Sequence, residues 1–274
     1  MPTPCPTAIL LVSCPDQRGI VAALAGFITA QHGNILALDQ YVDAQDAVFF
    51  ARMEWELEGF AFPLEEFPTR FAAVADAFDI TWTLHRSDKR RRMAIMVSKQ
   101  AHCLYDILAH HESGEWPADI VQVISNHEDH RHLAERHGLP FAYIPVTPDT
   151  KATAEAQQIE LLQKAGTDVV VLARYMQILS PAFVQAFPTK IINIHHSFLP
   201  GFKGAKPYHQ AHARGVKMIG ATAHYVTKDL DEGPIIHQDV ESINHADKPD
   251  DLVRKGRDIE RRVLSSAVRN HLEG

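Results

Sequence analysis

Short apolar segments alternate with helical stretches over most of this 274-residue chain, and that alternation restricts the fold more than any other feature. The segments with the length and composition of strands are 93–97, 120–124, 141–144, 169–172, 191–194, 219–226 and 235–240. Helical periodicity is found between or after them at 102–112, 128–137, 152–165 and 249–271. Strands joined by crossover helices pair in parallel, so the pattern predicts an α/β fold with a Rossmann-like, mostly parallel sheet. Ligands bind such sheets at the carboxyl ends of the strands.

The first part of the chain has a different pattern, which follows the order βαββαβ and predicts a ferredoxin-like domain. Strands are expected at 8–12, from 35, at 48–55 and at 80–84, with helices from 20 and at 67–78. Asp16 is the expected N-cap of the first helix, and Gly33 is expected to end it.

A polar stretch without periodicity separates the two patterns. It predicts a domain at 7–85, a linker at 86–91 and a second domain at 92–274. The basic run Lys89–Arg92 falls there and is interpreted as a solvated linker. The formal net charge of −7 leaves no concentrated basic surface, so nucleic acid is not an expected partner.

The cysteine pattern and the apolar segments indicate where the protein works. Cys5, Cys14 and Cys103 are widely separated, which is typical of a reducing compartment rather than of a disulfide framework. We expect neither a signal peptide nor a membrane-spanning helix, because no apolar run approaches the roughly 20 residues that a membrane span requires. The expected location is the cytoplasm.

A polar cluster that directly follows an apolar strand carries the chemistry. Asn193, His195 and His196 come at the end of strand 191–194, and Asp231 lies on a later loop with Gly-Pro after it. Asn193 and His195 can donate hydrogen bonds to an oxyanion that forms at a small carbonyl group. Asp231 can deprotonate a water or relay its proton, and a carboxylate suits this role best if burial raises its pKa toward neutrality.

These motifs, Asn-x-His-x-Ser-x-Leu-Pro and Leu-Asp-x-Gly-Pro, resemble the signature of the folate-dependent formyltransferase family over residues 92–274. The resemblance implies that Asn193, His195 and Asp231 are catalytic, whereas Asp229 matches no family carboxylate. The segment 172–179 resembles the family's folate-binding segment. The candidate substrate-binding residues are Arg174, Tyr175, Met176, Ile178, Leu179, His196 and His224.

The loop after the strand 93–97 separates two branches of this family. Members that formylate a phosphate-bearing amine use a glycine-rich loop, because glycine lets backbone N–H groups approach the anion. Residues 98–104 contain no glycine. They and the segment 197–209 resemble instead the branch that hydrolyses 10-formyltetrahydrofolate to formate and tetrahydrofolate.

The first domain resembles an ACT domain in its segments 14–21 and 33–35. The resemblance implies a regulatory module that binds an amino-acid effector, with Asp16 and Asn34 as candidate contacts. It also implies a homo-oligomer formed by pairing of these modules.

Alternatives remain open beside hydrolysis. The same site could transfer the formyl group to an amine, and the chain could be a non-catalytic sensor of folate and an amino acid. Whether His196 contacts the substrate or only packs behind His195 is also open.

No metal or cofactor is expected beyond the folate substrate. His127, His130 and His132 lie near Glu128 and Asp129. That stretch is better explained as the start of a helix capped by Asn126, since no further ligand completes a metal shell. No dinucleotide or Walker A loop occurs in the sequence.

Overall fold

The structure is a computed structural model, which describes residues 5–201 and 207–273. The chain forms two compact units that divide between Arg90 and Arg91, inside the segment 86–91 that was expected to be a linker. Residues 202–206, which belong to the segment 197–209 used for the family resemblance, lie outside the described residues.

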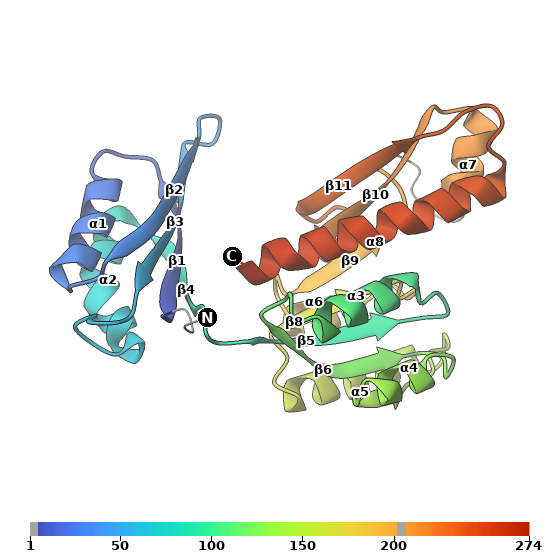
Figure 1. Cartoon of the computed structure of the whole chain (residues 1–274), viewed down its shortest axis with the longest axis horizontal. Helices are drawn as coiled ribbons and strands as arrows, with labels where there is room; N and C mark the ends of the chain where they lie inside the picture. Colours follow the sequence, from blue (N-terminus) through green and yellow to red (C-terminus); the bar gives the residue numbers. More distant parts are fainter. Residues whose placement is uncertain (1–4, 202–206, 274) are drawn as a thin grey trace. The chain divides into compact units, whose positions relative to one another are not determined.

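The first unit follows the order βαββαβ (Figure 1). Its elements are β1 (Thr7–Pro15), α1 (Ile20–Ala30), β2 (Ile35–Asp43), β3 (Val48–Glu56), the short 3-10 helix η1 (Leu64–Glu66), α2 (Phe67–Phe78) and β4 (Thr81–Arg86). The strands form a sheet in the order β2-β3-β1-β4, in which all neighbours are antiparallel. Alternate side chains of β1 and β3 pack against α1 and α2 and form the core of this unit.

Two local predictions for the first helix were wrong. Asp16 does not cap α1; the N-cap is Gly19, with φ 96° and no side-chain cap, because the chain turns there through the left-handed conformation that glycine adopts readily. The left-handed residue after the helix is His32, with φ 62°, and not Gly33. Gly33 is required by packing instead, because a Cβ there would lie 2.5 Å from Cγ2 of Ile28.

The second unit contains the sheet that the alternating pattern predicted. Its strands are β5 (Arg91–Val97), β6 (Ala118–Ser125), β7 (Phe141–Tyr143), β8 (Val169–Leu172), β9 (Ile191–His195), β10 (Met218–Tyr225) and β11 (Ile235–Ser242). They pair in the order β11-β10-β9-β8-β5-β6-β7. The pairings from β9 to β7 are parallel, and β10 is antiparallel to both β9 and β11.

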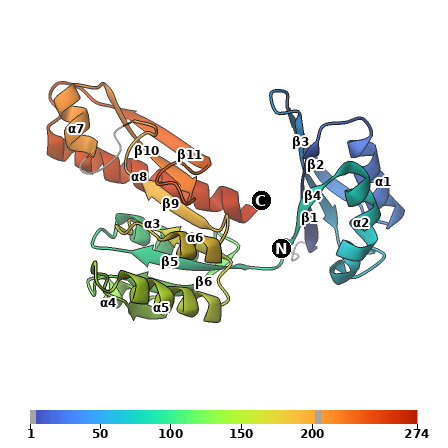
Figure 2. The same cartoon turned by 180° about the vertical axis from the view of Figure 1, so that it is seen from behind.

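Helices cover both faces of this sheet. They are α3 (His102–Glu112), α4 (Arg131–Arg136), α5 (Lys151–Lys164), α6 (Pro181–Ala186), α7 (Pro207–Arg214) and α8 (Pro249–Glu273). One core lies between the sheet and α3, α4, α7 and α8, and a second lies between the opposite face and α5 and α6. Figure 2 shows α6 on the face opposite α8. β5 has β6 on one side and β8 on the other, so the order in which strands are added to the sheet reverses at β5. A ligand crevice is expected at the carboxyl ends of the strands at this point.

The helix expected at 128–137 is shorter than its periodicity predicted. It begins at Arg131 with His130 at the N-cap position, so Asn126 does not cap it. Asn126 follows β6 directly, and its Oδ1 accepts a hydrogen bond of 2.7 Å from the hydroxyl of Ser98 at the end of β5. The side chain of Asn126 therefore bonds to the end of β5 and not to the N-terminus of α4. In the described part of the chain, no helix is both long and apolar enough to span a membrane.

Candidate active site

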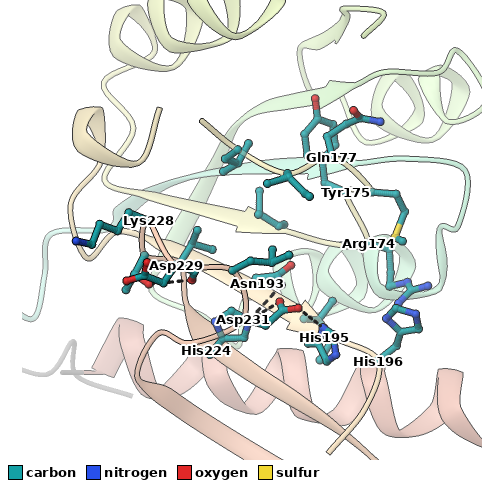
Figure 3. A pocket seen from close by; sticks show the side chains of 18 residues that line it. Arg174, Tyr175, Gln177, Asn193, His195, His196, His224, Lys228, Asp229 and Asp231 are labelled. Atoms are coloured by element: carbon teal, nitrogen blue, oxygen red, sulfur yellow. Dashed lines mark hydrogen bonds and ion pairs between the residues drawn. The ribbon is translucent and has the colours of Figure 1, made fainter. Parts of the chain in front are cut away.

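A cavity of about 480 Å³ lies at the carboxyl ends of β8 and β9 (Figure 3). The segment after β8, the end of β9 and the loop between β10 and β11 line it. The fold brings together residues from 172 to 231, as the strand-end positions of Asn193 and His195 led us to expect.

One wall of the cavity is apolar and partly open. Tyr175, Met176, Ile178 and Leu179 line it, together with Leu230 from the opposite loop. Met176 is 54% exposed, and Ile178 and Leu230 are each 59% exposed, although all three are large apolar residues. Exposed apolar side chains that meet in one concavity are typical of a binding site for a flat organic ligand.

Asp231 lies between two histidines at the base of the cavity. Its Oδ2 is 3.2 Å from Nδ1 of His195, and its Oδ1 is 3.5 Å from Nε2 of His224. Nδ2 of Asn193 lies 3.2 Å from the same nitrogen of His224. Figure 3 shows Asp231 pointing toward His195, with Asn193 beside it. All three residues expected to be catalytic thus belong to one network, and His224 joins it.

The loop that carries Asp231 is held by its glycine. A Cβ at Gly233 would overlap the carbonyl group of Tyr225, so only glycine lets the loop pass so close to β10. The N–H of Tyr225 then donates to the carbonyl of Pro234 over 2.9 Å. Asp231 itself has a left-handed φ of 56°, a conformation that acidic residues tolerate better than most. Packing against β10 therefore fixes the position of the carboxylate.

The pKa of Asp231 is lowered, so the condition under which this carboxylate would best deprotonate water is not met. The hydrogen bond from His195, followed by that from His224, lowers its pKa below 3.8, and together they outweigh burial, which acts in the opposite direction. Asp231 is therefore a carboxylate across the neutral range. Such a group is a weak proton acceptor and a strong partner for a neighbouring cation.

Hydrogen-bond partners assign the protons on the two histidines. Nδ1 of His224 lies 2.9 Å from the carbonyl oxygen of Tyr225, which only accepts, so that nitrogen carries a proton, and Nε2 carries one as well when it donates to Asp231. Nδ1 of His195 faces the Asp231 carboxylate and likewise donates. Nε2 of His195 is buried and has no hydrogen-bond partner among the described residues. It is therefore available to exchange a proton with a bound molecule.

His196 has different surroundings from His195. It lines the cavity next to Arg174, and its ring packs edge-on against Tyr208 with the centroids 6.2 Å apart. Burial, followed by the charge of Arg174, lowers its pKa to about 4. His196 is thus a neutral ring at neutral pH, and it does not contact the carboxylate that holds His195.

Sequence patterns did not reveal a group of polar residues beside Arg174, of which Tyr208 and Glu260 are buried. It consists of Gln100, His102, Tyr208 and Glu260. The one available signal was Glu260, an acid among the apolar positions that α8 turns to the core, where it is 1% exposed.

One set of potential metal ligands gathers among the described residues, and it differs from the histidines considered above. The ligand atoms of His102, Cys103 and Glu260 lie within 4.8 Å of one another. The guanidinium of Arg174, 3.4 Å from Glu260, already supplies positive charge there. Burial, followed by the charge of Glu260, raises the pKa of Cys103 well above 9.0, which keeps the thiol protonated. These neighbours disfavour a cation.

The two candidate effector contacts do not meet within one chain. The backbone N–H of Asp16 donates to Ala47, just before β3 begins, whereas the side chain of Asn34 donates to Glu56, where β3 ends. A nine-residue strand spans roughly 26 Å between these points. One copy of the first unit therefore cannot form a single small-molecule site from both residues.

The fold and the site define the class of protein to which the chain belongs. The formyl transferase family matches residues 91–268, so the second unit is a formyl transferase domain. A curated formyltetrahydrofolate deformylase from Synechocystis sp. is 52% identical over 267 residues, which are 97% of this chain and 94% of that protein.

Solved structures lead to the same family. The crystal structure of a formyltetrahydrofolate deformylase from Pseudomonas syringae pv. tomato is 45% identical, has a TM-score of 0.96, and matches over 98% of this chain and 90% of its own. A glycinamide ribonucleotide transformylase from Symbiobacterium toebii is 34% identical with a TM-score of 0.64, and covers 68% of this chain and 89% of its own. The chain belongs to the formyltetrahydrofolate deformylase family, which confirms the resemblance found in its motifs.

Proposed function

We propose that this protein hydrolyses 10-formyltetrahydrofolate to formate and tetrahydrofolate. The observation that carries the proposal is the ionised Asp231 bound to Nδ1 of His195, which leaves Nε2 without a partner near Asn193. This arrangement lies at the end of a cavity with an apolar wall. Family membership at 52% identity supports the same activity.

The apolar wall would bind the pterin part of the substrate. Tyr175, Met176, Ile178 and Leu179 offer a flat surface of the right chemistry. Arg174, His196 and His224 surround the end of the cavity where the formyl group would lie. The formyl carbon then faces Asn193 and His195.

In the proposed reaction, His195 acts as the proton acceptor and Asp231 as its charge partner. Nε2 of His195 takes a proton from water while the hydroxide adds to the formyl carbon, and Asn193 donates its amide N–H to the oxyanion. The Asp231 carboxylate stabilises the imidazolium that results. The bond between the formyl carbon and N10 then breaks, the proton passes to N10, and formate and tetrahydrofolate leave.

This assignment differs from the expectation that Asp231 itself deprotonates water. That role requires a carboxyl group with a raised pKa, whereas both histidines lower the pKa of Asp231. Acting through His195, Asp231 still activates the water, in the manner of the carboxylate that orients a catalytic histidine.

We propose that the first unit is an ACT-like regulatory module that pairs with a second copy. Its βαββαβ order and antiparallel sheet support this proposal, as do the segments 14–21 and 33–35 on which the resemblance rests. An amino-acid effector would then bind between copies, because Asp16 and Asn34 lie at opposite ends of β3 in one copy. The cytoplasm remains the proposed location.

The test is incubation of the purified protein with 10-formyltetrahydrofolate in a buffer without amines. We expect formate and tetrahydrofolate to appear in equal amounts. A protein that binds the folate without releasing formate would instead support the sensor hypothesis. Release that requires an added amine would support formyl transfer.

A further inference from the structure

A cluster of polar and charged side chains borders the cavity at Arg174, and Arg174, Tyr208 and Glu260 are its buried members. Nε and Nη2 of Arg174 donate to Oε1 of Gln100 over 3.1 and 2.9 Å, and Nε lies 3.4 Å from Oε2 of Glu260. The same Glu260 oxygen is 2.7 Å from Nε2 of His102, and its Oε1 accepts from the hydroxyl of Tyr208 over 2.8 Å. We call these five residues the Arg174 cluster.

Burial of the charged groups in the Arg174 cluster costs free energy. Arg174 is 6% exposed and Glu260 is 1% exposed, so both charges have lost most of their hydration. Nη1 of Arg174 is buried without a hydrogen-bond partner in the described structure, and Arg174 has a left-handed φ of 64°. Buried ion pairs are often no more stable than apolar side chains of the same volume. The cost of this cluster therefore indicates a role other than stability.

Its position relative to the reacting atoms suggests the role. Only Arg174 among the five lines the cavity; the other four lie behind it. Figure 3 shows its guanidinium next to His196, on the side of His195 away from Lys228 and Asp229. Arg174 therefore lines the cavity on the His196 side of His195.

The glycine-free loop after β5 contributes to the Arg174 cluster. Gln100 and His102 come from that segment; Gln100 accepts hydrogen bonds from Arg174, and His102 pairs with Glu260. Ser98 receives the N–H of Met176 on its hydroxyl, which ties the loop to the segment after β8. Side chains of this segment thus hold the wall of the cavity.

We propose that Arg174, held by Gln100 and Glu260, selects water as the nucleophile by filling the space that an amine acceptor would need beside the formyl carbon. This inference rests on the proposed function. An amine carries at least one carbon group, and its reactive nitrogen can approach only if that group has room behind it. Removal of the propylguanidinium side chain opens such room on this side of the cavity.

The test compares two products of one reaction. Wild type and the double variant Arg174→Ala/Glu260→Gln are each incubated with 10-formyltetrahydrofolate and increasing concentrations of glycinamide, a small primary amine. The second substitution avoids an unpaired buried carboxylate, which would destabilise the protein. For the double variant we expect the ratio of N-formylglycinamide to formate to rise at least about tenfold over wild type, the discrimination that a pocket achieves against one extra methylene group.

A matched control separates volume from charge. Arg174→Met/Glu260→Gln removes the same charges but keeps a long side chain, so we expect its ratio of N-formylglycinamide to formate to stay at the wild-type value, whatever its overall rate. If the methionine variant transfers the formyl group as well as the alanine variant, filling of space is not the determinant. If the alanine variant yields formate alone, or wild type formylates glycinamide equally well, the inference is overturned.

Two further results keep the inference testable and distinct from the proposed function. If the alanine variant does not fold, Gln100→Ala, which frees one side of the guanidinium, takes its place, and we expect a smaller gain in transfer. No gain there also overturns the inference. Absence of formate release by wild type would instead contradict the proposed hydrolysis.

Discussion

At the scale of single residues, the ionisation of Asp231 decides what the site can do. Two histidines lower its pKa, so the carboxylate acts through His195 and not as a free base. Sequence motifs favoured Asp231 over Asp229, and Asp231 is the carboxylate that lies beside His195. They could not show its pKa, because His224 approaches it from β10 through pairing that the motifs do not encode.

We expect Asp231→Asn to lower the turnover number for formate release by about 10⁴-fold, the effect of removing a carboxylate that orients a catalytic histidine. The KM for 10-formyltetrahydrofolate should change little, because the apolar wall is untouched. Steady-state kinetics measure both quantities. Asp229→Asn is the matched control, since Asp229 lines the same cavity, and it should stay close to wild type. Equal losses in both variants would contradict the assignment.

At the scale of secondary structure, elements buried on both sides were the most predictable. β8 was predicted with its observed bounds at 169–172, and β5 and β9 nearly so, because both faces of these strands are covered by helices and their sequences are mostly apolar. The short helices α6 and α7 were not predicted, because such short segments do not show a clear helical periodicity. Gln100 and Glu260 were missed because their partner Arg174 lies 74 and 86 positions away in the chain.

The long helix α8 also carries a titratable group whose effect on stability can be measured. Burial, followed by the charges of Arg91 and Lys190, lowers the pKa of His271 from 6.5 to about 4. Between these values the unfolded chain holds a proton that the folded chain does not. Folding stability contributed by this group is therefore complete above pH 6.5 and is lost as the pH falls toward 4.

We expect His271→Gln to remove that dependence while keeping an acceptor for the hydroxyl of Tyr225, which now lies 2.9 Å from Nδ1 of His271. The free energy of unfolding should fall less steeply with pH in the variant, by up to about 1.4 kcal/mol per pH unit. Urea denaturation at several pH values between 4 and 6.5 measures the slope. Identical slopes in both proteins would show that His271 is protonated in the folded state.

At the scale of the whole molecule, the chain forms two compact units that divide between Arg90 and Arg91. The proposed pairing of the first unit with a second copy can be tested by experiment. On its sheet, Tyr41 of β2 and Phe50 of β3 lie opposite each other and are 65% and 43% exposed. Their neighbour Phe49 points to the helices and is buried, so Tyr41 and Phe50 belong to the uncovered face. A second copy is the partner that ACT-like pairing requires.

We expect Tyr41→Lys combined with Phe50→Glu to lower the molecular mass measured by sedimentation equilibrium, because charges would have to be buried between the copies. Tyr105→Lys is the matched control, since Tyr105 is 54% exposed on α3 of the other unit. An unchanged mass in the double variant, or an equal decrease in the control, would contradict pairing through this face.

The ion pair between Arg174 and Glu260 also limits how such a protein can evolve. Loss of Arg174 alone leaves the buried carboxylate of Glu260 without its ion pair. Such a change lowers the free energy of unfolding by about 3–5 kcal/mol, which is a large part of the stability of a typical domain. Loss of Glu260 alone likewise leaves a buried guanidinium without its counter-charge. A lineage that loses this ion pair must therefore change positions 174 and 260 together or pass through a less stable intermediate, so the two substitutions are epistatic.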